Sequence, residues 1–392
     1  MSEFERFGVV HAESVIDVEH VIDRARALWR RASGKVPTAQ VELYAKASSR
    51  IRVSQRSSAE DVELQLVRET GHALRVMPRG ANRAAFAASS GWSNSALDWT
   101  LEAAMESGPQ RPALVPRGAD VPAERFDLDA QAVIPSEDAL RSALLRRPFL
   151  RSIEAGTTLE TLIGADGWVA VRRRHRLWGV ADTPRVRLVA QRGFERWEDC
   201  FDLPNEVSQS APIAGRRQTL TLSNDAAGPV VSALVDQFHG PSANQKPRVG
   251  PGWEIADDPR YSDGLSGGTF DDSGFPTTRR VLAEGAVWVG RLAGPGTLWR
   301  SSFRNSPVES ASNLVMASSD AGGDPAPTTH ARVIRMSPTL WVLELDTSVG
   351  RKWLRVDPRW LLAACSHRMG VTVVSSAGPI VPALRFEGVK VS

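Results

Sequence analysis

Two pairs of adjacent aspartates are the residues of this sequence best suited to chemistry. Asp257-Asp258 and Asp271-Asp272 flank a glycine-rich stretch, and hard cations prefer such clustered carboxylates. Aspartate side chains also fix turns and caps, because they accept hydrogen bonds from nearby backbone amides. We expect the turn and cap role for both pairs and keep a metal site as the alternative.

Three arginines near these aspartates could act in recognition. Arg279 and Arg280 follow the second pair, and Arg304 lies farther along the chain. A guanidinium group can hold a substrate carboxylate through two parallel hydrogen bonds, and it can equally pair with an internal aspartate. We expect internal ion pairs.

Other candidate ligands are isolated in sequence. His239 has no second ligand at metal spacing, whereas a zinc site needs about three protein ligands. Cys365 and His367 could form a ligand pair, or a nucleophile with its base. They follow the apolar run 360–364, which reads as a buried helix. We therefore expect both residues to pack in the core.

A basic run from Arg172 to Arg176 could contact nucleic acid. It stands between the apolar runs 169–171 and 177–178, so we expect part of it to project from a strand edge, where charge deters aggregation. The whole chain has 48 basic and 45 acidic residues and a net charge of only +3. Because nucleic-acid-binding proteins normally have a strong basic excess, we expect no nucleic-acid partner.

The composition is that of a globular protein. The 392 residues are 42% apolar and 24% charged, and the length suffices for two domains. No apolar run is long enough to span a bilayer, and the first residues lack the order of a signal peptide. Two cysteines cannot build a disulfide framework. We expect a cytoplasmic protein without a membrane partner.

The first 110 residues have the pattern of a compact α+β unit. Apolar residues recur at helical spacing over 14–33, with Ser14 as N-cap and Gly34 as stop. Short alternating runs then predict an antiparallel meander, and a second helix follows Ser93. The predicted strand runs are 41–47, 51–53, 62–66 and 73–77, with turns at 48–49, 57–58 and 69–71.

The remainder is predominantly β. Residues 107–135 read as a linker, and a third helix begins at Ser136 and stops before Pro148. A short apolar helix is predicted over 230–238, after Gly228-Pro229. Predicted strand runs are 167–171, 186–189, 218–222 and 280–289 with a turn at 284–285, and 332–345 and 371–391 form a further β-rich portion. We expect an α+β domain over 1–110, a linker and helix over 111–160, and a larger β-rich domain over 161–392.

The order of residues in 252–292 resembles a family signature. It contains D-D-P, then F-D-D-S-G, an arginine and a closing G-R-L, and is similar to the D-D-P…F-D-D-E-G…R…G…G-x-L signature of the TldD/TldE (PmbA) peptidase family. Three further segments resemble that family in the same order: 69–87 its E-x-G hairpin, 300–314 its R-x-S-F-R segment, and 381–392 its closing strand. The resemblance covers most of the chain and implies a TldD/PmbA-like fold.

The same resemblance implies a subunit without the metal site. The catalytic type carries H-E-x-x-x-H on a helix before the signature, and a cysteine near the C-terminus. Here Leu234 and Val235 stand at the first His and the Glu, and only His239 fits the last ligand. A shift by one residue places Asp236 at the Glu position but supplies no first His, and segment 374–378 has no cysteine. The chain is similar to the TldE type, with no catalytic residue, metal or cofactor of its own.

In that family two subunits enclose a narrow channel that holds an extended peptide as an added strand. The resemblance therefore implies a heterodimer or larger complex with a TldD-like catalytic partner that carries zinc, and an unfolded peptide as substrate. Family roles include trimming of modified ribosomal peptides, and the shortness of this chain favours such a pathway. Candidate channel residues are Asp257, Asp258, Asp271, Asp272, Gly274, Arg279, Arg304 and Asn313.

Two other functions remain open at the level of sequence. One is a stand-alone peptide-binding or chaperone-like module without a peptidase partner. The other is an independent enzyme that uses residues such as Asp271, Asp272 and His239 on a substrate that the sequence does not name. Zinc binding and peptide hydrolysis by the isolated chain would distinguish these alternatives.

Overall fold

The structure is a computed structural model of the chain. It describes residues 16–55, 62–109, 111–112, 124–128, 135–147, 150–181, 187–190, 217–222, 227–228, 230–232, 235, 252–261, 264, 266–285, 287–318, 330–336, 341–347, 350–356, 365–374 and 380–390.

Helices and long strands alternate in the first half of the described chain. The elements are α1 (Val18–Lys35), β1 (Ala39–Gln55), β2 (Val62–Pro78), β3 (Arg83–Ser90), α2 (Asn94–Ser107), β4 (Arg111–Pro112), β5 (Glu124–Asp127), α3 (Glu137–Arg146), β6 (Leu150–Ile163), β7 (Val169–Ala181) and β8 (Arg187–Ala190).

The second half is built from shorter strands. They are β9 (Arg217–Leu222), β10 (Trp253–Asp257), β11 (Arg280–Glu284), β12 (Val287–Trp288), β13 (Leu298–Trp299), β14 (Val308–Glu309), β15 (Leu314–Ser318), β16 (His330–Met336), β17 (Trp341–Thr347), β18 (Gly350–Val356), β19 (Cys365–Val374) and β20 (Ile380–Lys390).

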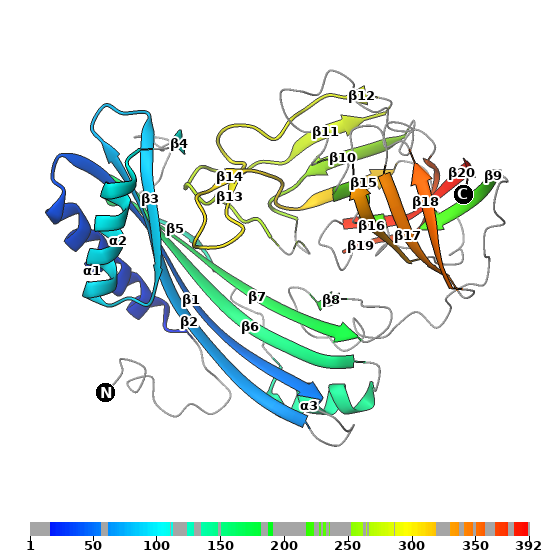
Figure 1. Cartoon of the computed structure of the whole chain (residues 1–392), viewed down its shortest axis with the longest axis horizontal. Helices are drawn as coiled ribbons and strands as arrows, with labels where there is room; N and C mark the ends of the chain where they lie inside the picture. Colours follow the sequence, from blue (N-terminus) through cyan, green and yellow to red (C-terminus); the bar gives the residue numbers. More distant parts are fainter. Residues whose placement is uncertain are drawn as a thin grey trace.

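One long curved sheet dominates the first half. Its described strands lie in the order β4-β3-β2-β1-β6-β7-β5, with β8 also paired to β7. Figure 1 shows α1 and α2 over its outer face, while the C-terminal strands lie opposite the inner face. The sheet continues through β6 and β7, past residues 110 and 160, where the sequence predicts changes of domain.

Apolar residues of one helix face and one sheet face form the main core. Val21, Ala25 and Leu28 of α1 are almost fully buried against Leu43 and Ala45 of β1. A second cluster packs α3 against β1 and β6. Because alternate strand residues point to opposite faces, the even-numbered residues of β1 lie on the face away from these helices.

The predicted helices exist, with one shift of boundaries. Ser93 and Ser136 are the N-caps of α2 and α3, as predicted, and each accepts a hydrogen bond from a backbone amide of the first turn. The prediction for the first helix is wrong at both ends. Asp17 caps α1 by accepting from the His20 amide at 3.2 Å, and the helix continues through Gly34 to Lys35. Ser14 lies outside the described residues.

Two predicted turns are wrong, although the antiparallel meander is confirmed. Ser48-Ser49 and the segment 69–71 lie inside β1 and β2, where Ser48 pairs with Glu69. Strand β1 is bonded on its other side to β6, where Ser48 pairs with Thr158. Pairing on both sides satisfies the backbone groups of Ser48 and Ser49, so contacts with neighbouring strands override the local preference for a turn.

The predicted linker 107–135 also contains strand structure. Strand β5 pairs in parallel with Val169–Arg172 of β7, and β4 pairs with the start of β3. The prediction of a connecting segment without strands is therefore wrong at these two places. Short strands with few apolar residues lack the alternation that identifies longer ones.

The second half forms smaller sheets. The described strands β12-β11-β10-β15-β20-β19 make one sheet, with β9 added to β20, and β16-β17-β18 make another. The predicted runs at 186–189, 218–222 and 280–289 correspond to β8, β9 and the β11–β12 hairpin. Strand β19 begins at Cys365, and the predicted helix 360–364 lies outside the described residues. No helix in the described ranges is long and apolar enough to cross a membrane.

Candidate functional site: the sheet–loop junction

The acidic signature docks onto the inner face of the long sheet. We call the contacts between that face and the loops 266–279 and 296–306 the sheet–loop junction. At its centre Arg172 of β7 is 2% exposed and pairs with Glu160 of β6 and Asp272 of the first loop. The guanidinium also donates to the Phe270 carbonyl at 3.1 Å and lies 5.4 Å from the Trp299 ring centre. This cation therefore joins both loops to the sheet.

The charges around Arg172 depend on one another. Burial alone would raise the pKa of Glu160, but the charges of Arg174 and Arg172 and the hydrogen bond from Arg172 hold it well below its usual range. The Arg172 Nε donates to Glu160 at 2.8 Å. Burial, and then the charges of Glu160 and Asp272, raise the pKa of Tyr44 well above its ordinary value. Glu160 is thus ionised at neutral pH, while Tyr44 stays neutral.

Asp271 organises the backbone of both loops. Its Oδ1 accepts from the amides of Ser273 at 2.9 Å and Phe275 at 3.0 Å, and its Oδ2 accepts from those of Gly296 at 2.8 Å and Leu298 at 3.2 Å. Burial raises the pKa of Asp271 to about 6, although these hydrogen bonds oppose the shift. The carboxylate has both oxygens occupied by amides, which confirms the expected turn role.

Asp272 connects the first loop to the sheet and to the second loop. Its Oδ1 accepts from Arg172, and its Oδ2 accepts from the Arg300 amide at 2.6 Å. The Arg300 guanidinium lies over Tyr44, 4.7 Å from the ring centre, and over Phe86 at 5.5 Å. Burial lowers the pKa of Arg300 to about 10. Asp272 therefore has an ion-pairing role as well as a turn role.

The first aspartate pair fixes a different loop. Asp257 Oδ1 accepts from the Ser312 amide at 2.9 Å and the Asn313 amide at 3.0 Å, and burial raises the pKa of Asp257. The Asp258 amide donates to the Asn313 carbonyl at 2.9 Å, and its carboxylate accepts from the Arg260 amide at 3.1 Å. Asn313 in turn binds the backbone of Ser266. These residues hold Asp258 and Ser266 against the start of β15.

Two glycines permit close contact across the junction. Gly274 has a φ of +88°, and a Cβ there would lie 2.2 Å from Trp168 Cη2. Gly71 lies inside β2, where a Cβ would come within 2.4 Å of Phe303 Cε2. Both aromatic rings belong to a buried cluster that also contains Phe270. Any larger residue at either position would push the loops away from the sheet.

The three candidate arginines have different partners. Arg279 pairs with Glu254, and its Nε lies 3.8 Å from the Asp258 carboxylate, as expected for internal ion pairing. Arg280 donates to the carbonyls of Ala293 and Pro295 and makes no salt bridge among the described residues, although its charge acts to lower the pKa of Asp257. The expectation is wrong for Arg304, which donates to Ser90 Oγ at 2.8 Å. Sequence spacing could not reveal these partners, because they lie on other loops and strands.

The basic run of β7 is only partly at a strand edge. The edge prediction is wrong for Arg172, because β5 covers that part of β7 and the side chain is buried. The residues 173–176 lie between the segments that pair with β5 and with β8. Charge alone gave no signal for the burial of Arg172. The acidic partners that compensate it are 12 and 100 residues away in sequence.

The helix that resembles the metal-binding motif is largely apolar where it is described, with Ser232 as the exception. Residues 227–228, 230–232 and 235 are helical, and Val230, Val231 and Val235 have 0% exposure. Leu234 and His239 lie outside the described residues. Within the described residues no group of three or more His, Cys, Asp and Glu could hold a metal ion. Cys365 and His367 pair with Phe386 and Arg385 in the β19–β20 ladder.

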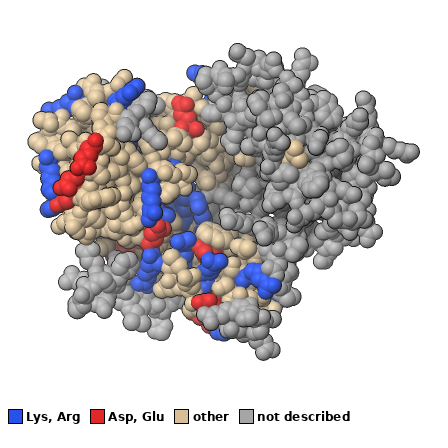
Figure 2. Space-filling model, in the orientation of Figure 1, with Lys and Arg blue, Asp and Glu red and all other residues tan. Residues whose placement is uncertain are grey.

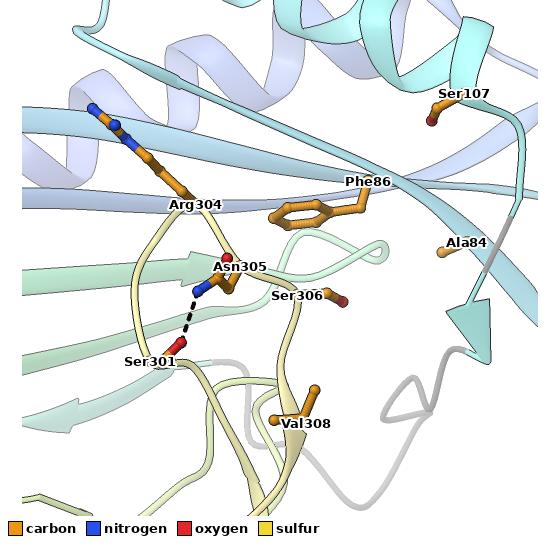
Figure 3. Close-up of a pocket in the computed structure, with 8 residues that line it drawn as sticks. All are labelled: Ala84, Phe86, Ser107, Ser301, Arg304, Asn305, Ser306 and Val308. Atoms are coloured by element: carbon orange, nitrogen blue, oxygen red, sulfur yellow. Dashed lines mark hydrogen bonds between the residues drawn. The ribbon is translucent and has the colours of Figure 1, made fainter.

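A pocket of about 370 Å³ lies beside the junction. Figure 3 shows Phe86 of β3 facing the loop that carries Ser306 and Val308, while the Arg304 guanidinium points away. Asn305 Nδ2 donates to Ser301 Oγ at 2.7 Å. The walls therefore combine serine hydroxyls, the Asn305 amide and Arg304 with the apolar side chains of Ala84, Phe86 and Val308, and these residues include no acid–base pair. The pocket can accommodate a small polar group, but its lining offers no catalytic chemistry.

Solved structures share this arrangement. TldE from Thermococcus kodakarensis gives a TM-score of 0.68 at 14% identity, over 94% of this chain and 100% of that chain. This chain has the TldE fold. A candidate modulator of a DNA gyrase from Thermotoga maritima gives 0.63 at 14% identity, over 96% of this chain and 100% of that one. A candidate modulator of DNA gyrase from Bacteroides thetaiotaomicron gives 0.61 at 12%, over 96% and 99%.

The likeness to TldE covers both halves of the chain. It confirms the expected α+β class with a TldD/PmbA-like arrangement. No protein-family profile matches the sequence, and no curated protein does. At these identities the likeness to TldE describes the fold, so the function has to be argued from the residues of this chain.

Proposed function

We propose that this chain is the non-catalytic, TldE-like subunit of a two-component, zinc-dependent peptidase. A TldD-like partner supplies the metal and cleaves the bond, and the substrates are unfolded or modified ribosomal peptides. Support comes from the TldE fold together with the ordered motifs of the sequence. The chain would be a cytoplasmic subunit of a pathway-specific pair.

The single observation that carries this proposal is the environment of Val235. A catalytic zinc needs an open coordination position and a general base beside it. Val235 occupies the position of that base in the family motif, and its side chain has 0% exposure. Val230 and Val231 on the same helical segment are equally buried. The three described valines of this segment pack as core, and none of its described residues is an acid or a base that could activate a water molecule.

A free strand edge supports the peptide-holding part of the proposal. Strand β2 pairs with β1 over its full length, but with β3 only from Gly71 to Val76. Among the described residues, no strand pairs with the stretch Leu64–Glu69 on its outer side, whereas the Thr70 carbonyl accepts from the Gly91 amide at 2.8 Å. Unpaired amides and carbonyls on such an edge bind an extended peptide with little sequence preference.

The test is co-expression with a TldD-like chain that contains H-E-x-x-x-H. The expected result is a stable complex that contains zinc and hydrolyses an unfolded peptide, while this chain alone binds no stoichiometric zinc. A Glu-to-Gln change in the partner's motif should abolish hydrolysis without dissociating the complex. Tight zinc binding or peptide hydrolysis by the isolated chain would contradict the proposal, as would partner activity that is unchanged when this chain is removed.

A further inference from the structure

The inner face of the long sheet carries an array of arginines that the sheet–loop junction does not use fully. Residues opposite each other in a β-ladder share a face. The register therefore places Arg50, Gly156 and Arg176 in one row across β1, β6 and β7. Arg52 lies in the row on one side of it, and Arg174 in the row on the other. We call Arg50, Arg52, Arg174 and Arg176 the arginine face.

Two of these cations are compensated by neighbouring carboxylates. Arg50 Nη1 lies 3.2 Å from Glu154, and Arg174 Nε lies 3.5 Å from Glu160. Arg52 and Arg176 are exposed. Within the described part of the chain, neither has a hydrogen bond or ion pair to a carboxylate. The arginine face therefore has excess positive charge at two known points.

The neighbouring groups are consistent with this excess. Burial, followed by the charge of Arg172, lowers the pKa of Arg174, and the charge of Arg176 acts in the same direction. Gly156 lies between Arg50 and Arg176, and a Cβ there would be 2.6 Å from Arg50 Cγ. The absence of a side chain lets the Arg50 stem lie across β6. Figure 2 shows Lys and Arg side chains gathered over the middle of the molecule, with a few acidic ones among them.

The distance between Arg52 and Arg176 indicates how far apart two anionic groups of a ligand would have to be. Arg52 and Arg176 stand on β1 and β7, which are separated by β6, and in adjacent rows. With strands about 4.8 Å apart and a rise of about 3.4 Å per residue, their Cα atoms are about 12 Å apart. An extended peptide spans that distance in about four residues. A guanidinium group binds a carboxylate in a fixed, forked geometry.

We propose that the arginine face binds an acidic segment of the peptide substrate, with carboxylates four residues apart on Arg52 and Arg176. This inference rests on the proposed function, because it assumes a peptide ligand. It adds a substrate class to strand addition at the β2 edge, which is indifferent to side-chain charge. Acidic substrates would be retained next to the docked loops, whereas neutral peptides would bind through backbone contacts alone.

The test uses the full chain and two labelled peptides of equal length. One is a Gly/Ser peptide with Asp at positions i and i+4, and the other has Asn at both positions. Binding is measured by fluorescence anisotropy at low and at high salt for the wild type, for the double variant Arg52→Gln/Arg176→Gln and for Arg173→Gln. Arg173 is the matched control, because it neighbours these residues on β7 but points to the opposite face. Unfolding midpoints verify that each variant is folded.

The wild type should bind the Asp peptide more tightly than the Asn peptide by about two- to twenty-fivefold, since each of the two exposed pairs contributes about 1.4- to fivefold. High salt should remove the preference for the Asp peptide, and so should the double variant Arg52→Gln/Arg176→Gln, whereas Arg173→Gln should retain it. Equal binding of both peptides would overturn the inference and leave the proposed function standing. Failure to bind either peptide would contradict both. An oligonucleotide that binds as tightly and is lost in the same double variant would identify a general polyanion surface instead, and would also overturn the inference.

Discussion

The carboxylate of Asp271 offers the sharpest test of how the acidic signature works. Its two oxygens accept hydrogen bonds from four backbone amides on two loops, and its side chain has 0% exposure. The substitution Asp271→Asn keeps the shape and one acceptor oxygen. It replaces the other oxygen with an NH2 group, which faces two amide donors and cannot accept from them.

The expected loss follows from those two amides. A buried donor without an acceptor costs about 1–3 kcal/mol, so Asp271→Asn should lower the free energy of unfolding by about 2–6 kcal/mol. Asp258→Asn is the matched control. Asp258 is partly exposed and accepts from one amide, that of Arg260, so its substitution should change stability by no more than about 1 kcal/mol.

Urea unfolding followed by tryptophan fluorescence gives the total change, at a pH of about 8, where a carboxyl group with a pKa of about 6 is ionised. Amide hydrogen exchange at Ser273, Phe275, Gly296 and Leu298 tests the local mechanism. Exchange at these amides should accelerate in Asp271→Asn while the β1–β2 ladder remains protected. The reasoning would be refuted if both variants lost equal stability, or if exchange at the four amides were unchanged.

Three further predictions concern the sheet and the loop docked on it. Gly274→Ala should lower the free energy of unfolding in urea by about 2–4 kcal/mol, because it combines backbone strain with a steric clash. The control is Gly80→Ala, where φ is +81° and the surrounding space is open, and it should lower that free energy by only about 1 kcal/mol. Equal losses in the two variants would contradict the clash at Gly274. Ion pairing lowers the pKa of Glu160 below its usual 4.5, so the contribution of this carboxylate to stability is present above pH 4.5 and declines as the pH falls below that value. In Glu160→Gln, the free energy of unfolding in urea should fall less steeply with decreasing pH. A pH dependence equal to that of the wild type would contradict this role of Glu160. Burial lowers the pKa of His72 from 6.5, so the folded state disfavours protonation of the imidazole. The free energy of unfolding should therefore fall as the pH drops from about 6.5 to 5. His72→Gln should lack this part of the decline, and a pH dependence equal to that of the wild type would rule out a contribution from His72.

The α+β class and most elements could be predicted from local patterns. Ser93 and Ser136 each precede an amphipathic run and cap a helix. The wrong turns at Ser48-Ser49 and 69–71 have a common cause, because β1 and β2 continue through polar residues that are paired across strands. Local preference cannot register a partner strand that arrives more than a hundred residues later, such as β6.

The candidate site was predictable in its residue types but not in its partners. The turn role of Asp271 follows from a glycine-rich neighbourhood, yet its contacts with Gly296 and Leu298 require a second loop. The burial of Arg172 was missed because a run of arginines normally indicates a solvated surface. The one available signal for this burial was the alternation of residues along β7, which places Arg172 on the same face of the sheet as Glu160 of β6.

The pairing of Arg172 with Asp272 has a consequence for synthesis of the chain. The two residues are 100 positions apart, and ribosomes add about 5–20 residues per second. Arg172 can therefore emerge about 5–20 s before the loop that covers this buried cation. During that interval the nascent sheet displays Arg172, Tyr44 and the polar inner face to the cell, with Glu160 as the nearest counter-ion. The acidic signature can then close over the first half of the molecule before most of the second half has been translated.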